Sequence, residues 1–348
     1  MGHALDSALG QLHAYGCELN NGLTNHAPMV AEALHHLGLD SAIEAWLSTE
    51  LKRCLLRPSH VQPVMLDEWQ DALADPARYS DWADLFNNEI GNMGWTATLQ
   101  QWVPRLTPGF ASAATHGIIR VGHATRALRD SKTEARLLEL AEALASWACN
   151  YFVLPFSTGK PLQLNPSHAL TGIALAPEDL RNTSGSITAA LAGLQAIPEF
   201  ADHFATLNVD DDIDELALDV AATFARLFCQ SARSVSGAIV FTHAITAVNA
   251  VRNIEPYLLA DDGKALLRQA FHTGCALHAV YSANRYAPPV HEPLPLDTAE
   301  CIYDALQHGD EHVIKLTDAC VTFTEATGDA FFLTAAERCR RLVPPRTR

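Results

Sequence analysis

A histidine and a lysine near the C-terminus have the types and spacing most suggestive of chemistry. His312 and Lys315 lie three residues apart, so in a helix they project from one face as neighbours. Leu316, Ala319 and Phe323 continue that face as an apolar stripe. Burying an unpaired ammonium is costly, which favours the neutral amine. Such an amine could form a Schiff base, act as a base, or take up CO2 as a carbamate that binds a metal through oxygen.

A simpler interpretation of Lys315 is that its side chain extends past the stripe to water, as long cationic side chains commonly do. The helix alone favours that interpretation. His308 and His312 form an HxxxH pair that could hold zinc. Gly309 between them predicts a helix break, so we discount the pair.

A second pair of histidines lies on an expected helix at 110–130. His116 and His123 are seven residues apart, which puts them on one side but about 10 Å apart along the axis. Ligands of one metal lie about 3 Å from one another, so only one of the two can bind it. Gly117 predicts close approach of another helix or a ligand. Arg120 and Arg126 could meet an anionic substrate or pair with acidic residues, and core histidines without a role are the alternative for the pair.

Three more histidines have informative surroundings. His26 directly precedes an expected helix start, where helix capping is the alternative to ligation. His243 lies among apolar residues, with Thr242 and Thr246 near enough to orient its ring. His278 is similar but has fewer polar neighbours. Most other histidines are expected on the surface or in loops: His3, His13, His35, His36, His60, His203, His272 and His291.

The elements that must position these residues are helices, because almost every segment has the helical period and none alternates convincingly. We predict an all-α fold: a single large multi-helix domain over 1–348, with two long irregular loops at 153–185 and 286–296. Ser131 is the expected cap of the helix at 132–152, and Pro104 is expected in a loop. Helices are expected at 4–16, 28–36, 41–55, 110–130, 132–152, 186–195, 198–206, 212–232, 237–259, 261–284, 297–307, 310–327 and 329–342, with short tryptophan-rich helices between 65 and 107.

Composition narrows the function classes. The 348 residues are 48% hydrophobic with a formal net charge of −16, which argues against nucleic acid or an anionic membrane as partner. Eight cysteines without a CxxC pair predict reduced core thiols of a cytoplasmic protein. Neither a secretory signal nor an apolar run of transmembrane length is expected. Sixteen histidines against five lysines favour a metal or acid–base site, and the sequence contains no GxGxxG, Walker or GxSxG motif for a nucleotide, flavin or hydrolase fold.

Taken together, these positions resemble the questin oxidase-like family over nearly all of the chain. The resemblance is carried by several segments in combination. They are Asn25-His26-Ala27-Pro28-Met29, Ala31-Glu32-Ala33-Leu34, Pro108-Gly109 leading into His116-Gly117-Ile118-Ile119-Arg120 and His123-Ala124, Thr242-His243-Ala244-Ile245-Thr246, and Asp310-Glu311-His312-Val313-Ile314-Lys315.

The resemblance implies a flavin-independent oxygenase of aromatic polyketide secondary metabolism. It would cleave a polycyclic aromatic ketone such as an anthraquinone, with a Baeyer–Villiger-like or dioxygenase outcome. The family's metal site implies one non-haem Fe(II) with one position open for O2 or substrate. Carried over to this sequence, the nitrogen ligands are His26, His116, His243 and His312, and Lys315 binds as its carbamate. His123 is then a catalytic residue that faces the substrate.

The predicted partners are O2 and a small aromatic molecule, and NADPH or another external reductant is a further candidate. Aromatic stacking is expected from Trp95, Phe156 or Tyr286. Two other functions fit the same residues: a dinuclear zinc hydrolase with a carboxylated lysine, and a metal-free helical protein that binds small molecules. Metal analysis separates the three. The sequence leaves open the substrate's ring system, the oligomeric state, and whether His278 takes part.

Overall fold

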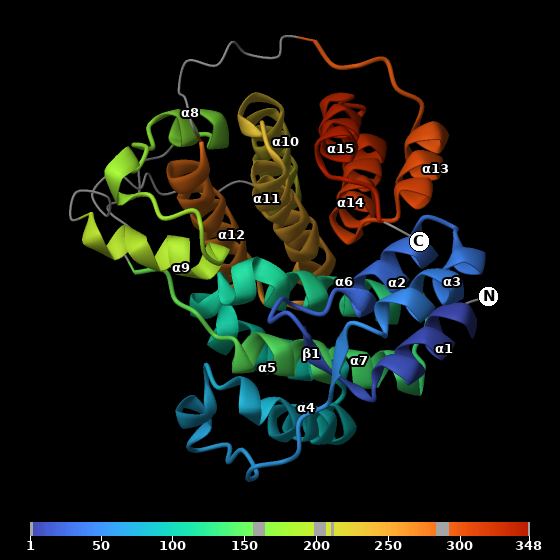
Figure 1. Cartoon of the computed structure of the whole chain (residues 1–348). Coiled ribbons are helices and arrows are strands. Elements are labelled where there is room, and N and C mark those ends of the chain that lie inside the picture. The colour runs from blue at the N-terminus through green and yellow to red at the C-terminus, as the bar shows by residue number, and fades with distance from the viewer. Residues whose placement is uncertain (1–2, 156–163, 198–206, 210–211, 283–291, 347–348) are drawn as a thin grey trace. The chain divides into compact units, whose positions relative to one another are not determined.

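The computed structural model describes residues 3–155, 164–197, 207–209, 212–282 and 292–346. Contacts group the chain into two compact units. Unit 1 takes its described residues from 3–152 and 253–262, and unit 2 from 153–252 and 263–346. Within the described ranges the chain forms fifteen α-helices and one two-stranded sheet (Figure 1). The predicted all-α class is confirmed, whereas a single domain over 1–348 stays a prediction.

Unit 1 contains the first seven helices and the small sheet. Its strands, β1 (Tyr15–Leu19) and β2 (Cys54–Leu56), pair antiparallel. The helix expected at 41–55 therefore ends too late, because β2 occupies its last residues. A strand of three residues is too short to show alternation in a sequence. The helices are α1 (His3–Leu12), α2 (Ala27–His36), α3 (Asp40–Glu50), α4 (Tyr79–Met93), α5 (Trp95–Leu106), α6 (His116–Asp130) and α7 (Glu134–Cys149).

Aromatic packing between α4 and α5 forms part of the core of unit 1. Trp82, Phe86 and Trp102 are fully buried, and their ring centroids lie 5.0 to 5.8 Å apart. Each such pair contributes about 0.5–1.5 kcal/mol beyond the area that it buries. Pro104 lies inside α5, so the expected loop there is wrong. A proline so near the helix end removes only a small part of the hydrogen-bond ladder.

The boundaries around α6 also differ from those predicted. The helix begins at His116 rather than 110, because two 3-10 turns (Thr107–Gly109 and Ser112–Thr115) precede it. The next helix, α7, is capped by Thr133, whose hydroxyl accepts a hydrogen bond from the amide of Arg136, and not by Ser131 as predicted.

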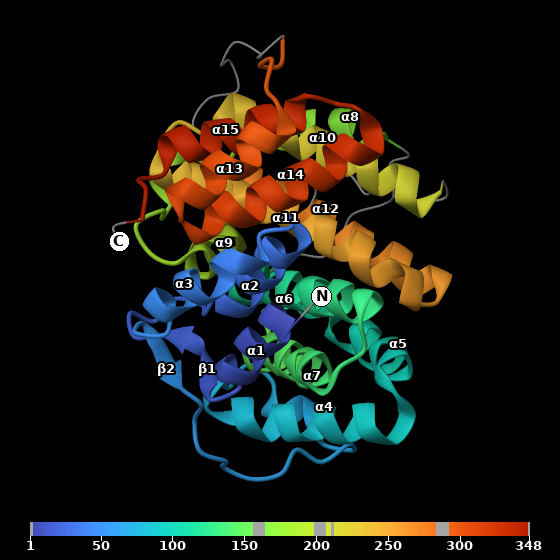
Figure 2. The same cartoon turned by 90° about the vertical axis from the view of Figure 1, so that its right-hand side faces the viewer.

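Unit 2 contains the remaining helices, and the last residues of α11 and the first of α12 belong to unit 1. Three of its helices, α13, α14 and α15, pack side by side (Figure 2). The aromatic rings of Phe323 on α14 and Phe332 on α15 stack 5.0 Å apart. The helices are α8 (Pro166–Thr171), α9 (Ile187–Ala192), α10 (Ile213–Ser231), α11 (Val235–Ile254), α12 (Ala260–Tyr281), α13 (Thr298–His308), α14 (Glu311–Thr327) and α15 (Phe331–Leu342).

The two expected loops can be followed only in part. The described part of 153–185 includes the short helix α8 and a 3-10 turn at Glu178–Leu180, so this segment is less irregular than predicted. The helix predicted at 198–206 and most of the loop at 286–296 lie outside the described residues, as do Phe156 and Tyr286.

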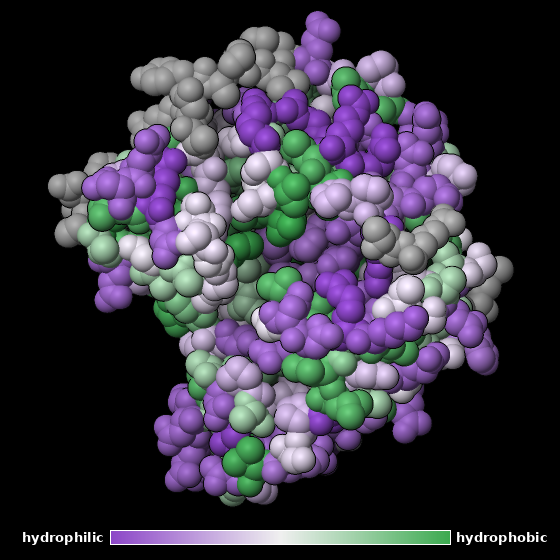
Figure 3. All heavy atoms as spheres, viewed as in Figure 1, coloured by the Kyte–Doolittle hydropathy of each residue, from purple (hydrophilic) through white to green (hydrophobic). Residues whose placement is uncertain are grey.

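One described segment, Val235–Tyr257, is long and apolar enough to cross a membrane by length and composition. The expectation that no apolar run reaches such a length is therefore wrong. Within the structure, 78% of its most apolar stretch is buried, as in the core helix of a globular fold. Hydrophobic residues on the face drawn in Figure 3 are interspersed with hydrophilic ones.

The cysteines match the prediction of reduced core thiols. All eight are free, and all but Cys54 are buried. The sulfurs of Cys17 and Cys149 lie 3.8 Å apart.

Candidate metal centre

In unit 1, two of the predicted ligands meet where two helices begin. His26 immediately precedes α2 and His116 is the first residue of α6. Their Nε2 atoms lie 2.6 Å apart, and both side chains are buried. At the bond lengths that metals form with imidazole, two nitrogens on an octahedral ion are about 3 Å apart. The observed separation is close to that value, so the pair has the donor type and nearly the spacing of a metal site.

The tautomer of His116 is set by the backbone. Its Nδ1 lies 2.5 Å from the carbonyl oxygen of Ala113, and a carbonyl can only accept. The ring proton is therefore on Nδ1, which leaves the lone pair of Nε2 directed towards His26. Metal-binding histidines commonly have their second nitrogen fixed in this way.

The backbone that supplies this carbonyl is strained. Ala113, Ala114 and Thr115 all adopt left-handed conformations, with φ of 44°, 57° and 73°. A left-handed residue with a β-carbon costs about 1–2 kcal/mol, and none of the three is glycine. Such outliers concentrate at functional sites, where the surrounding structure holds them. Here they turn the chain so that α6 starts at His116.

Close packing of α6 on α7 holds the start of α6. A β-carbon on Gly117 would lie 2.9 Å from the Cα of Trp147 on α7. The indole Nε1 of Trp147 also donates to the carbonyl of Gly109, 3.0 Å away. The predicted close approach at Gly117 is confirmed, and its neighbour is a helix.

His123 has different partners from His116. Its Nδ1 lies 2.6 Å from the Glu32 carboxylate on α2, and the same carboxylate receives two hydrogen bonds from Arg126. Burial by itself raises the pKa of Glu32, but the charge of Arg126 and the hydrogen bonds from His123 and Arg126 outweigh it and lower that pKa. Glu32 is therefore a carboxylate, and His123 donates to it through Nδ1.

Arg120 is likewise used inside the protein. Its guanidinium donates to both oxygens of Glu139, at 2.7 and 2.9 Å, and to Glu142 at 3.2 Å. Of the two roles considered for Arg120 and Arg126, pairing with acidic residues is the one observed.

In unit 2, His243 on α11 and His312 on α14 face each other. Their ring centroids lie 5.7 Å apart with the planes 73° from parallel. Asp310 caps α14 by accepting the amides of His312 and Val313. His312 is thereby placed in the first turn of the helix.

Lys315 follows His312 by one turn of α14 and is 1% exposed. Within the described ranges it makes no hydrogen bond or ion pair. Burial lowers the pKa of Lys315 to about 8, although Glu311 and Asp310 act in the opposite direction. The predicted apolar stripe is also buried, since Leu316, Ala319 and Phe323 are fully enclosed. An exposed, solvated Lys315 is therefore excluded, and burial favours the neutral form of the amine.

Several other histidines are outside these clusters. His308 ends α13, Gly309 breaks the helix with a φ of 76°, and the Nε2 of His308 donates to the carbonyl of Val343. The HxxxH pair was thus rightly discounted. His278 Nδ1 lies 2.7 Å from the hydroxyl of Ser282. The surface prediction for His272 is wrong, because His272 is 1% exposed and burial lowers its pKa to about 4.

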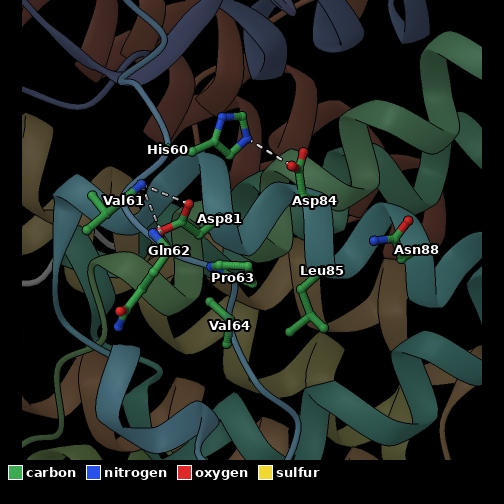
Figure 4. Close-up of a pocket in the computed structure, with 9 residues that line it drawn as sticks. All are labelled: His60, Val61, Gln62, Pro63, Val64, Asp81, Asp84, Leu85 and Asn88. Atoms are coloured by element: carbon green, nitrogen blue, oxygen red, sulfur yellow. Dashed lines mark hydrogen bonds and ion pairs between the residues drawn. The ribbon is translucent and has the colours of Figure 1, made fainter.

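A surface pocket of about 410 Å³ in unit 1 contains none of the predicted site residues (Figure 4). Asp81 accepts the backbone amides of Val61 and Gln62 beside it, and His60 pairs with Asp84 at 2.8 Å. These contacts attach the 60–64 segment to α4. Trp95, the described member of the predicted stacking residues, packs on Tyr257 with centroids 4.6 Å apart.

Two groups that hold the site histidines have no predicted role in the sequence analysis: the Glu32 carboxylate and the Ala113 carbonyl. Glu32 lies six residues after His26, nearly the same spacing as the seven residues from His116 to His123. Parallel spacing on two helices is a signal that could have paired them. The carbonyl of Ala113 could not have been found, because nothing in Ala113-Ala114-Thr115 predicts left-handed backbone.

A family model described as Questin oxidase-like matches residues 23–320, most of the 348-residue chain. All of the predicted ligands and His123 lie within the matched range. No curated protein matches the chain significantly.

Proposed function

The chain belongs to the Questin oxidase-like family, an oxidase family, and on that premise we propose that it is a non-haem iron oxygenase. It would cleave a carbon–carbon bond of an aromatic or quinonoid substrate with O2, in secondary metabolism and in the cytoplasm. NADPH or another external reductant remains a candidate co-substrate. The proposed ligands are His26 and His116 in unit 1 and His243, His312 and Lys315 in unit 2.

The observation that carries this proposal is the His26–His116 pair. Because the Nδ1 proton of His116 is donated to Ala113, the hydrogen between the two Nε2 atoms belongs to His26. A metal ion can take both lone pairs only when that proton leaves or moves to Nδ1 of His26. The move to Nδ1 leaves both imidazoles neutral, and acid weakens metal binding because a doubly protonated imidazole has no lone pair to donate.

Lys315 supplies the anionic donor in this proposal. The neutral amine attacks CO2, a nitrogen–carbon bond forms, one N–H proton is lost to solvent, and a carbamate of charge −1 results. Four neutral imidazoles carry no negative charge, so the carbamate balances part of the ion's charge. The burial of Lys315 and its lowered pKa support this role because only the neutral amine reacts.

Iron bound by imidazole and carboxylate donors with an open position supplies the activation of O2. The chain's own contribution is to hold these imidazoles in place, with the tautomer of His116 fixed by the carbonyl of Ala113, and to keep them from bulk water. His26, His116, His243 and His312 are each less than 8% exposed.

A hydrolase with two zinc ions is the alternative with some support in unit 2. Donor atoms of Asp310, Glu311 and His312 lie within 4.8 Å of one another. The same oxygen of Asp310, however, already accepts two backbone amides at the start of α14. A second ion there would compete with the helix cap, so one iron is the preferred interpretation.

Metal analysis of the purified protein, combined with O2 uptake, tests the proposal. One iron per chain and substrate-dependent O2 consumption are expected. Two zinc ions without O2 uptake would indicate the hydrolase, and a metal-free protein that still binds aromatic ligands would indicate a binding protein. Removing bicarbonate should lower the iron content, and unchanged iron in Lys315→Met would exclude the carbamate.

A further inference from the structure

The structure of unit 1 holds a buried Glu32–His123–Arg126 triad that the metal ligands do not explain. We propose that His123 is the base that removes a proton from a phenolic hydroxyl of the substrate, and that Glu32, held by Arg126, is the residue that positions it. This rests on the proposed function, because it specifies the substrate as a hydroxylated aromatic ring.

The geometry fixes one tautomer of His123. Glu32 Oε2 accepts the Nδ1 proton at 2.6 Å, so the lone pair of the imidazole is on Nε2. Glu32 itself is held on both oxygens, by Arg126 Nε at 2.8 Å and by its terminal nitrogen at 2.5 Å. All three residues are at most 6% exposed. A carboxylate that orients an imidazole through Nδ1 is the arrangement by which histidine bases are held for proton transfer.

The other nitrogen of His123 is not used by the fold. Nε2 makes no hydrogen bond with any residue that the structure describes, whereas Nδ1 is held by Glu32. The free lone pair indicates a partner from outside the chain.

The charges of the triad support proton transfer to His123. Arg126 keeps Glu32 ionised. Once Nε2 accepts a proton, the adjacent carboxylate stabilises the imidazolium. Within unit 1, Glu32 and Arg126 are the charged groups in contact with His123 among the described residues.

The proton-transfer step is simple. The phenolic O–H bond breaks, its electron pair stays on oxygen as a phenolate, and the proton forms an N–H bond at Nε2. A phenolate makes its ring more electron-rich, which favours attack by oxygen at a ring carbon. His116 and His123 are seven positions apart, which corresponds to about 10 Å along α6. That spacing prevents both from binding one ion but suits a fused-ring substrate that reaches from one to the other.

The test uses Glu32→Gln with Glu139→Gln as its matched control. Glu139 is also buried and also receives two hydrogen bonds from an arginine, Arg120, but no histidine among the described residues is hydrogen-bonded to it. Both variants break a buried pair, so both lose stability. In Glu32→Gln alone we expect kcat/KM to fall by about 10²-fold or more. Iron content should stay unchanged in that variant.

A second measurement is independent of turnover. A monohydroxyanthraquinone, whose absorption shifts to longer wavelength on ionisation, is titrated into metal-free protein near pH 7. Wild-type protein and Glu139→Gln should bind it as the phenolate, and Glu32→Gln and His123→Gln as the neutral phenol. If Glu32→Gln does not fold, Arg126→Lys replaces it, because this variant weakens the hydrogen bonds that hold Glu32. A smaller shift towards binding of the neutral phenol is then expected.

The outcomes separate this inference from the proposed function. Phenolate binding by a protein that lacks iron and turnover would leave the inference standing and remove the oxygenase. Neutral-phenol binding by wild type, no binding, or equal effects of Glu32→Gln and Glu139→Gln would overturn the inference. Loss of iron in His123→Gln would make His123 a metal ligand instead of a base.

Discussion

In unit 1, the chain itself satisfies the nitrogen atoms that orient its site histidines: Ala113 holds His116, and Glu32 holds His123. In unit 2, Lys315 is buried on α14 without a hydrogen bond or ion pair to any described residue. Unit 1 is therefore organised before any ligand binds, at the expense of strained backbone. Unit 2 retains a group whose burial is unfavourable until CO2 or a metal changes its chemistry. Hydrogen bonds within the chain thus orient the site residues of unit 1, whereas Lys315 in unit 2 gains a favourable partner only when CO2 or a metal binds.

Removing one proposed ligand from each unit tests this comparison with the largest expected effect. His116→Ala and His312→Ala should each lose essentially all bound iron. This loss is larger than the 10- to 100-fold fall in metal affinity that is typical when a residue hydrogen-bonded to a metal ligand is replaced. Iron content is measured by elemental analysis. His123→Ala and His308→Ala are the controls and should retain iron. If only one unit's variant loses iron, the ligands assigned to the other unit are wrong.

The cost of burying Lys315 can be measured directly. Burial lowers its pKa from 10.5 to about 8, so below pH 8 the folded protein contains a buried ammonium that the unfolded chain exposes to water. The wild-type free energy of unfolding should rise between about pH 8 and 10.5, where the unfolded chain binds the extra proton. In metal-free, bicarbonate-free protein, Lys315→Met should gain about 3 kcal/mol at pH 7 and less at pH 10. Urea unfolding at both pH values checks this, and equal gains at both would contradict it.

The packing that holds α6 should be sensitive to one methyl group. Gly117→Ala places a β-carbon 2.9 Å from the backbone of Trp147, which cannot yield as a side chain can. We expect a loss of about 1–3 kcal/mol in the free energy of unfolding. Gly91→Ala in α4, where no atom lies within 4 Å of the added carbon, is the control and should be neutral or slightly stabilising. Equal losses in both variants would argue against the close contact.

Relieving the backbone strain should have the smallest effect, in the opposite direction. Ala113→Gly removes the β-carbon from a left-handed residue and should gain up to about 1 kcal/mol, because the glycine's greater freedom when unfolded offsets part of the relief. Thermal unfolding measures the gain, with Ala111→Gly, at a residue of ordinary φ, as the destabilised control. A loss in Ala113→Gly similar to that in the control would contradict the assigned strain.

The fold class could be predicted because most helices here are long and periodic. α10, α12 and α14 were expected within three residues of their observed ends, and Asp310 marks the start of α14. The wrong predictions concern an element that is short and a helix end that depends on contacts distant in the sequence. The three residues of β2 have no period of their own, and the start of α6 depends on left-handed residues that are enforced by tertiary packing.

Residue types at the site were more predictable than their roles. The apolar stripe of α14 is buried as its helical period predicts, but the helix alone favoured a Lys315 side chain that reaches water, and that interpretation is wrong because Lys315 is buried. The partners of Arg120 and Arg126 could not be decided, because Glu139 and Glu32 lie on other helices. Which of His116 and His123 adjoins His26 likewise depends on how α2 lies against α6, and spacing along one helix cannot determine it.

The order in which the chain visits its two units has a practical consequence. It passes from unit 1 to unit 2 near residue 152, returns for 253–262, and leaves again, so the described part of unit 1 is built from two separate stretches. A single cut in the gene therefore cannot yield both units intact. Truncations and swaps with relatives would divide one of them, and a transferable module of this protein has to include the whole length from α1 to α15.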